Sequence, residues 1–496
     1  MRILYIDCDT LRPDHLGCYG YHRNTSPNID GIAARGVRFN NYYVTDAPCL
    51  PSRSALMTGR FGIHTGVVNH GASNADPFRE GETRGFNDGH DRLGYIRRLH
   101  QQGIFTAVVS SFAYRHSAWW FYAGFNEMHC NNIGGMESAD RITPDALAWL
   151  DRKGRDDNWY LHVNYWDPHT PYRAPEDLGN RFADDPPPAW HSEEVRKKHW
   201  ESYGPHGARE PQGITSEPTP LSEKYPQAPR EIASQADYKR WIDGYDNGIR
   251  YMDDHIGEIL AKVDELGIRD ETAIIVSADH GENQGELGIY GDHQTADHIT
   301  SRVPLIVSWP GVTPTNQTND ALLYNVDFGP TLAELSGSPS STLWDGESFA
   351  KAVRGESFQG HGYLVVSQCA WSCQRAVRWD KWLLIRTYHP GMKPFPPLML
   401  FDIENDPHEQ SNLAEAHPEL VNQGLAYLED WHTKMMASSE SAEDPLWRVM
   451  REGGPLHTRS DVDPYAQRLR ETGREHLVPE LTANNPMWTP PPKRVN

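Results

Sequence analysis

The stretch Ile3-Leu4-Tyr5-Ile6-Asp7-Cys8-Asp9 decides the expected fold of this chain. Its first four residues form a short apolar run, and such runs are typical of strands that are buried on both faces, as in parallel sheets. Four further runs have the same character and are also followed by polar residues: Thr106 to Val109, Tyr160 to Val163, Ala273 to Val276 and Pro304 to Val307. We therefore expect a sheet in which these five runs are strands.

Helical patterns separate the apolar runs, and they cover Asn28 to Arg35, Thr143 to Arg152 and Tyr238 to Glu265. Strands that alternate with helices predict the α/β class, with an open sheet flanked by helices. Ligands of such sheets bind beyond the carboxyl ends of the strands. The polar residues that follow the strands are therefore the expected place of the chemistry.

Two later regions depart from this alternation. Arg173 to about Ala236 is polar and rich in proline, and we expect a surface excursion near the site. From His361 onward, antiparallel strands are indicated at Tyr363 to Val366, Ala376 to Trp379 and Trp382 to Thr387, and a helix at Leu413 to Met436. We predict a catalytic domain over residues 1–360 and a smaller C-terminal α+β subdomain over residues 361–496. Its extended tail from Pro479 is expected to pack on its own body or on a neighbouring subunit of a homo-oligomer.

The composition excludes several partners. The chain has 47 Lys+Arg and 68 Asp+Glu, a formal net charge of −21, whereas nucleic-acid binding needs a clustered basic surface. Six cysteines in 496 residues are too sparse for a disulfide framework. No secretion signal or membrane span is visible in the sequence. We expect a cytoplasmic protein without a nucleic-acid or membrane partner.

The strongest chemical signal is Cys49-Leu50-Pro51-Ser52-Arg53, which continues to Thr58-Gly59-Arg60. Pro51 suits a first helical turn and Gly59 suits a helix end, so a short helix with Cys49 at its N-terminus is predicted. The amide dipoles at that end would stabilise an anionic oxygen. Arg53 follows Cys49 by four residues and shares its helix face, as a fixed positive partner. The alternative is a buried structural cysteine beside a surface arginine.

This pattern, Cys-x-Pro-Ser-Arg with a Thr-Gly-Arg ending, resembles the signature of the type I sulfatases, which belong to the alkaline phosphatase superfamily. Ser26-Pro27-Asn28-Ile29-Asp30, Arg302-Val303-Pro304-Leu305-Ile306 and Leu400 to Pro407 also look like landmarks of that family, in the expected order. The resemblance spans residues 1 to about 415. It implies an alkaline-phosphatase-like fold with a mixed, mostly parallel sheet, and oxidation of Cys49 to formylglycine by a maturation enzyme.

Carboxylates follow two of the predicted strands, in Asp7-Cys8-Asp9 and in Asp279-His280-Gly281-Glu282. Such carboxylates repel one another unless a cation neutralises them, and hard divalent ions prefer oxygen ligands. The resemblance implies that Asp9, Asp279, His280 and the modified Cys49 bind one divalent cation. Calcium is the first choice, and magnesium or manganese the next.

One departure concerns Thr10, because many sulfatases carry a second aspartate at that position. Either one ligand is missing or Asp7 helps. Asp7 shares the face of Asp9 on a regular strand but lies further back, so we place it behind the ligands. A helix cap or a surface charge is the alternative role for either aspartate.

Two histidines are candidates for catalysis. His169, in Asp167-Pro168-His169-Thr170-Pro171-Tyr172, resembles the family histidine that binds substrate. His293, in Tyr290-Gly291-Asp292-His293, falls where relatives often carry a lysine that contacts the sulfate and assists the leaving group. A protonated imidazole could do both. The alternative for His293 is a histidine of a surface loop.

A larger departure lies at Ser110-Ser111-Phe112-Ala113, where many sulfatases show a Lys-Trp-His segment that binds sulfate. His116 is close enough in sequence to substitute, and Asn69 or His64 are further candidates for substrate binding. Phosphonate monoester hydrolases share the cysteine motif and also lack that segment. The sequence therefore does not determine which leaving group the substrate carries.

The expected reaction is hydrolysis of a small sulfated substrate, a monosaccharide or an oligosaccharide, with Cys49, Arg53, His169 and His293 as catalytic residues. The strongly acidic chain disfavours a long polyanion. A phosphonate monoester or phosphodiester hydrolase with the same nucleophile is the first alternative. The second is an unoxidised protein that binds only a metal or a glycan.

Overall fold

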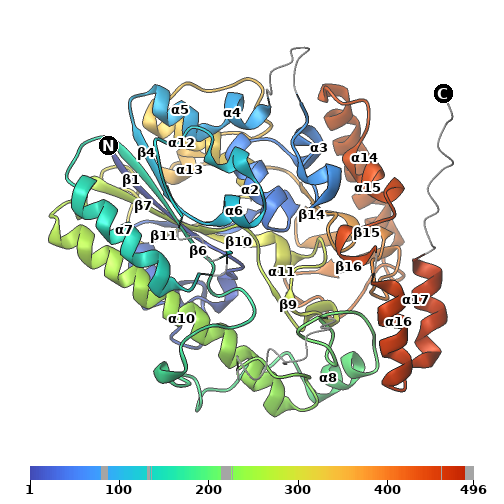
Figure 1. Cartoon of the computed structure of the whole chain (residues 1–496). Coiled ribbons are helices and arrows are strands. Elements are labelled where there is room, and N and C mark those ends of the chain that lie inside the picture. The colour runs from blue at the N-terminus through green and yellow to red at the C-terminus, as the bar shows by residue number, and fades with distance from the viewer. Residues whose placement is uncertain are drawn as a thin grey trace.

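The computed structural model describes residues 1–79, 88–130, 134–135, 137–213, 225, 227–459 and 461–485. Within this part of the chain the main sheet has nine strands, eight of which lie in one row (Figure 1). The row is β11 (Gln317–Asn319), β2 (Val37–Tyr43), β10 (Arg302–Ser308), β7 (Thr272–Ala278), β1 (Arg2–Cys8), β6 (Trp159–Tyr165), β4 (Phe105–Val109) and β5 (Glu127–His129). The ninth strand, β12 (Leu323–Tyr324), pairs with β2.

All five predicted strands are present, as β1, β4, β6, β7 and β10. β1 lies between β7 and β6 and is parallel to both, with Cys8 opposite Ala278 and Tyr165. β10 is antiparallel to β7 and to β2, and the other pairings of the sheet are parallel. β1, β6 and β7 are buried along their whole length, because helices cover both faces. The predicted α/β fold with a mixed, mostly parallel sheet is confirmed.

The helices form two layers (Figure 1). One contains α1 (Pro27–Ala34), α7 (Ala139–Lys153) and α10 (Gln235–Glu265), and the other contains α2 (Cys49–Thr58), α5 (Tyr95–Gln101) and α12 (Phe328–Ser336). α10 starts at a capping box between Ser234 and Asp237. It buries residues three or four apart, the spacing of one helix face: Trp241, Tyr245, Ile249, Met252, Ile256, Ile259 and Val263.

A second sheet joins the C-terminal region to the start of the chain. Its order is β16 (Leu398–Asp402), β15 (Trp382–His389), β14 (Cys373–Trp379), β13 (Leu364–Gln368) and β3 (Asp46–Ala47). β13 to β16 are antiparallel neighbours, and three of them are the strands expected from the sequence. β3 is parallel to β13, with Ala47 opposite Gln368. This pairing ties the residues just before Cys49 to the C-terminal sheet.

The predicted C-terminal helix begins later than the sequence suggested. α14 runs Pro418–Ser438 instead of starting at Leu413, because Pro418 occupies the first helical turn. It is followed by α15 (Pro445–Arg451), α16 (Val462–Glu471) and α17 (Val478–Asn484). The segment from Pro479 to Asn484, expected to be extended, is therefore helical, and Leu481 is buried beside Tyr203. The rest of the predicted tail, residues 486–496, lies outside the described residues.

The excursion between Arg173 and Ala236 contains α8 (Glu193–Trp200), and residues 214–224 and 226 of it lie outside the described part. It packs against the strand pair β8 (Asn283–Gln284) and β9 (Tyr290–Asp292), where His191 and His199 bond the Tyr290 hydroxyl at 2.7 and 2.8 Å. The excursion thus lies beside the segment that leads to His293. No helix among the described residues is both long enough and apolar enough to cross a membrane.

Candidate active site

Helix α2 is held at the carboxyl end of the main sheet by the strand that precedes it and by two hydrogen bonds. β3 enters it from the second sheet, and Gly59 ends it in the left-handed conformation at φ 66°. The Asn325 amide donates to the Ser52 carbonyl at 3.1 Å, and the Ser52 hydroxyl donates to the Asp279 carbonyl. Every residue of α2 is buried. Cys49 therefore faces the residues that follow β1 and β7 in a fixed orientation.

Asp9 and Asp279 lie side by side because β1 and β7 are parallel and in register up to Cys8 and Ala278. The Arg53 guanidinium contacts Asp9 and Asp279 with one nitrogen, at 3.1 Å each, and Asp7 with the other. The deeper position expected for Asp7 agrees with its contacts, because its carboxylate faces Arg53 and His162. The positive charge of Arg53 therefore stabilises three neighbouring carboxylates in one position.

Four side chains could share one cation: Asp9, Cys49, Asp279 and His280 each bring one ligand atom within 4.8 Å of the others. The Cys49 Sγ is 3.1 Å from His280 Nε2. His280 Nδ1 donates to the Gly281 carbonyl at 2.8 Å, so Nε2 is the ring nitrogen that faces Cys49 and the carboxylates. Figure 1 shows α2 beside the main sheet.

The site fits a divalent cation on two observations. Asp9 Oδ1 is buried and has no hydrogen-bond partner among the described residues. In addition, Asp7, Asp9 and Asp279 bring three negative charges against the one charge of Arg53, and burying the excess is costly without a cation. Two carboxylates and an imidazole suit calcium, magnesium or manganese.

Thr10 occupies the position at which the resemblance in sequence led us to expect a further aspartate, and its main chain contacts Asp279. Its φ is 58°, in the left-handed region, and its amide donates to Asp279 Oδ1 at 3.2 Å. A β-branched residue seldom adopts this conformation, so the surrounding contacts must hold it there. The Thr10 backbone thus orients a candidate ligand and does not replace the missing carboxylate.

In the absence of a bound cation, the surroundings of Cys49 favour the protonated thiol over the thiolate. Burial, and then the charges of Asp9 and Asp279, raise the pKa of Cys49 well above its ordinary value, against the opposing effect of Arg53 and Arg115. A cysteine nucleophile needs a lowered pKa. The unmodified side chain is therefore a poor nucleophile in this environment.

His293 and His169 lie next to this group. The His293 ring is 4.1 Å from the His280 ring and 5.8 Å from the His169 ring, between centroids. Burial, and then His280, lower the pKa of His293 well below its ordinary value. Burial, and then Arg115, lower the pKa of His169 to about 3. Both rings are neutral at pH 7 without substrate, whereas the sequence analysis considered a protonated His293.

The candidates for substrate binding separate into two groups. His116 follows α6 (Phe112–Arg115), and its ring centroid lies 5.2 Å from that of His70. The side-chain oxygen Oδ1 of Asn69 accepts a hydrogen bond from the His70 backbone amide at 2.8 Å. His64 lies elsewhere. Its ring bonds Asp345 at 2.7 Å and the Met435 carbonyl at 2.8 Å, so it fastens α14 to the catalytic part.

Arg115 is a candidate that the sequence analysis missed. Its guanidinium lies 5.2 Å from the Trp166 ring centroid and donates to the Gly135 carbonyl, and no acidic side chain of the described residues pairs with it. Its charge lowers the pKa of Cys49 and of His169. It follows the Ser110 to Ala113 segment that lacks the family lysine, and a search for any cation just after that segment would have found it.

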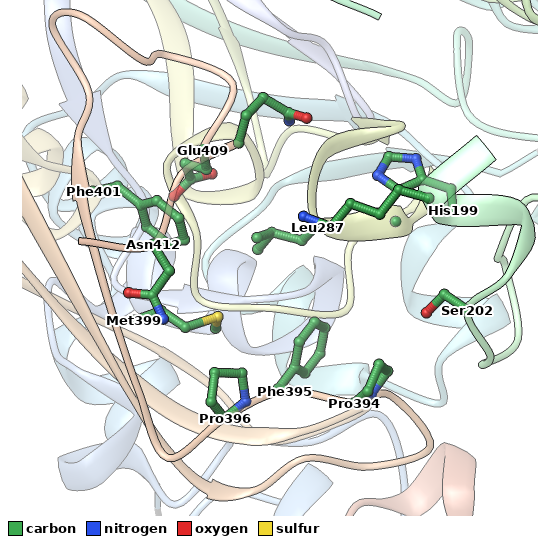
Figure 2. Close-up of a pocket in the computed structure, with 13 residues that line it drawn as sticks. His199, Ser202, Leu287, Pro394, Phe395, Pro396, Met399, Phe401, Glu409 and Asn412 are labelled. Atoms are coloured by element: carbon green, nitrogen blue, oxygen red, sulfur yellow. The ribbon is translucent and has the colours of Figure 1, made fainter. Parts of the chain in front are cut away.

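A cavity of about 210 Å³ lies apart from this group, between α8, the turn at Leu287 and β16 (Figure 2). Phe395, Met399 and Phe401 give it an apolar wall, and Glu409 lies at its rim. Cys49 and its cation-binding neighbours do not line it. The chemistry expected from the sequence therefore does not take place there.

Two family models match the sequence of this chain. The model of the family described as Sulfatase matches residues 2–338, and that described as N-sulphoglucosamine sulphohydrolase, C-terminal, matches residues 285–430. The chain is 26% identical over 434 residues to choline-sulfatase of Rhizobium meliloti, covering 79% of this chain and 78% of that protein. It is 24% identical to N-acetylglucosamine-6-sulfatase of Bos taurus, covering 79% and 76%.

Solved structures show the same fold. BT4656 in complex with its substrate D-glucosamine-2-N,6-O-disulfate has a TM-score of 0.67 at 18% identity, covering 89% of this chain and 99% of that chain. A phosphonate monoester hydrolase from Silicibacter pomeroyi has a TM-score of 0.65 at 19% identity, covering 89% and 96%. The fold alone therefore does not separate the two activities. The family model matches more than half of the chain, and the relatives above are sulfatases: this chain belongs to the sulfatase family and is a sulfuric ester hydrolase.

Proposed function

We propose that this sulfatase removes a sulfate ester from a small sulfated sugar, with a nucleophile made from Cys49 and with one divalent cation. The observation that supports it best is the convergence of Asp9, Asp279 and His280 on Cys49 at the N-terminus of α2. Oxidation of Cys49 to formylglycine, by a maturation enzyme and an external oxidant, supplies a hydrated aldehyde whose hydroxyl is the family's nucleophile. The raised pKa of the unmodified Cys49 thiol in the absence of a cation agrees with this need for conversion.

The cation, calcium as first choice, would be held by Asp9, Asp279, His280 and residue 49. When bound, it supplies Lewis-acid polarisation of ester oxygens. Arg53 is engaged with the carboxylates and is fully buried, so its proposed role is to position these ligands. The first amides of α2 point to where negative charge develops on residue 49 and the ester.

The substrate anion is proposed to lie near Arg115. With a dication bound, Asp7, Asp9 and Asp279 are balanced by that ion and by Arg53, so the sulfate ester brings one uncompensated charge. Arg115, which pairs with no described acidic side chain, supplies the counter-charge. The entering anion raises the pKa of His293 and His169, so either ring can hold a proton for the departing alcohol oxygen.

The choice of a sulfated sugar rests on the relatives and on charge. Besides the bovine enzyme, the relatives include an N-acetylglucosamine-6-O-sulfatase of Bacteroides thetaiotaomicron, 22% identical over 489 residues. The net charge of −21 disfavours a long polyanion, so a monosaccharide or short oligosaccharide is the better substrate.

The test combines mass spectrometry with kinetics. Protein made with the maturation enzyme should show an aldehyde at position 49 in the peptide mass, and Cys49→Ala should lose turnover of N-acetylglucosamine 6-sulfate without unfolding. Chelation should abolish activity and calcium should restore it. A thiol at position 49 in fully active protein, or a near-normal rate of Cys49→Ala, would contradict the proposal. An aldehyde-free protein that binds sugar without turnover would support the second alternative, a binding protein.

Phosphonate monoester hydrolysis is a second candidate activity for the same centre. It is favoured by the absence of the Lys-Trp-His segment at Ser110 to Ala113 and by the structural likeness to the Silicibacter hydrolase. Comparison of kcat/KM for an aryl sulfate and for the matching aryl phosphonate monoester separates the two. The proposal expects sulfate to be preferred, and a clear preference for the phosphonate would overturn it.

A further inference from the structure

Four aromatic side chains lie beside the catalytic centre, and we call them the histidine–tryptophan wall: His70, His116, His457 and Trp371. The His70 ring is 6.5 Å from the His293 ring, 5.2 Å from His116 and 5.3 Å from His457. Trp371 stacks on His457 with the centroids 4.6 Å apart. All four side chains are partly exposed, whereas Cys49 and His280 are buried. The wall therefore lies between the centre and solvent.

The wall is built by a C-terminal segment that docks on the loop after α3 (Gly62–Thr65). The His457 amide donates to the Ala370 carbonyl at 3.1 Å, and Glu452 accepts from Asn74 at 3.1 Å. Leu456 covers Gly71 so closely that a Cβ there would be 2.7 Å from its Cδ2. His457 lies beyond both family matches, which end at residues 338 and 430. Residues outside both matched regions thus contribute a side chain next to the centre.

The hydrogen bonds of the wall are incomplete. His70 Nδ1 and His457 Nε2 are 3.1 Å apart, so one donates and the other accepts. In either arrangement His70 Nε2 still needs a partner, and it is buried without one among the described residues, as is His116 Nε2. Depending on the tautomer, the missing partner is an acceptor or a donor. A hydroxyl group serves as both, whereas an anion serves only as an acceptor.

The wall also carries no fixed positive charge. Burial lowers the pKa of His70 and of His457, and it lowers the pKa of His116 to about 3. Neutral imidazoles next to the partly exposed indole of Trp371 combine polar edges with apolar faces. Sugar rings have matching properties, with hydroxyl groups at their edges and C–H groups on their faces.

We infer that the histidine–tryptophan wall binds the sugar ring of the substrate. His70 and His116 bond its hydroxyls, His457 fixes the tautomer and position of His70, and Trp371 contacts a C–H face. The inference rests on the proposed function, because it places the ring whose sulfate enters the centre. His457 is a positioning residue, since it acts through His70.

The first experiment measures binding without hydrolysis. Unsulfated N-acetylglucosamine is titrated into the Cys49→Ala protein, alone and combined with His457→Ala, His457→Gln or the control His476→Ala. His476 is exposed and lies in the same C-terminal region. We expect His457→Ala to raise Kd about 10-fold, His457→Gln about 3-fold because its amide can still bond His70, and His476→Ala to leave Kd unchanged. Equal Kd values for all variants, or no binding by the parent, would overturn the inference.

The second experiment separates the wall from the chemistry. In the matured enzyme, His457→Ala should raise KM for N-acetylglucosamine 6-sulfate about 10-fold with little change in kcat, and change KM for methyl sulfate or another sugar-free sulfate ester far less. A loss of kcat on all esters would show a role in the reaction itself and would overturn the inference. Failure of the parent enzyme to hydrolyse any sulfate, with sugar binding intact and dependent on His457, would overturn the proposed function alone.

Discussion

Replacement of Arg53 by glutamine tests whether the three carboxylates depend on the guanidinium. Arg53 is fully buried and contacts Asp9 and Asp279 at 3.1 Å each, in addition to Asp7. Removing one partner of a buried ion pair costs about 3–5 kcal/mol, because the other charge stays buried and unpaired. Domains of this kind have about 5–15 kcal/mol of stability, so Arg53→Gln should still fold at low temperature.

A cation changes the size of this effect. In chelator the three carboxylates of the variant have no counter-charge, and the full loss of about 3–5 kcal/mol is expected. At saturating calcium the ion neutralises two charges, so the loss should be clearly smaller. Urea unfolding in both conditions measures the two values. Activity should fall at least about 100-fold even with calcium, because the ligand carboxylates are no longer held in place.

The matched control is Arg375→Gln. Arg375 is also buried and is bidentate to one carboxylate, Asp444, at 2.8 Å for both contacts, outside the centre. It should lose similar stability with no dependence on calcium and keep its activity. The reasoning about Arg53 is refuted if its variant loses less than about 1 kcal/mol in chelator, or if calcium affects both variants equally.

Three further changes test separate parts of the structure. Arg115→Gln should raise KM for an aryl sulfate about 10- to 100-fold, because a charge-assisted hydrogen bond to the anion is lost, as measured by steady-state kinetics. His64→Ala should lose about 1–3 kcal/mol in urea unfolding with unchanged kcat/KM, because His64 bonds Asp345 and Met435 outside the centre. His361→Gln should lose most stability below about pH 6.5. Burial lowers the pKa of His361, but the hydrogen bond and the charge of Asp327 together raise it more, so the net shift is upward. Because the folded pKa is raised, that contribution is present at low pH and disappears as the pH rises through it.

Each of these three predictions has an outcome that would contradict it. A normal KM of Arg115→Gln would remove it from substrate binding, and Arg35→Gln, at an exposed pair with Asp270, serves as the neutral control. A large loss of kcat/KM in a folded His64→Ala protein would return His64 to the site. A His361→Gln difference that grows above about pH 8 would reverse the sign argued for the Asp327 pair.

The parts of the site that could be predicted from the sequence are those that depend on patterns of neighbouring residues. The run Ile3 to Ile6 belongs to β1, so Asp7 lies near the carboxyl end of that strand and Asp9 follows it, and Asp279 follows β7 in the same way. Pro51 and Gly59 delimit α2 and place Arg53 one turn from Cys49. These features depend on periodicity and on helix ends, which involve residues near one another in the chain.

Contacts between residues that are far apart in the chain could not be predicted from the sequence. The sequence placed Arg53 near a developing charge, but only packing of α2 on two strand ends shows that carboxylates occupy its guanidinium. His116 was the first substitute considered and His64 a further candidate, and the tertiary structure places His64 against α14 and His116 against His70.

The sequence by itself determined the α/β class, the helix that begins at Cys49 and the carboxylates that collect at the strand ends, because each follows from short-range pattern. Only the tertiary structure decided that β3 joins the C-terminal sheet, that Arg115 lies on Trp166 and that His457 reaches His70. The physical reason is that such contacts join segments up to 387 residues apart, and their formation depends on how whole layers pack and not on any local signal.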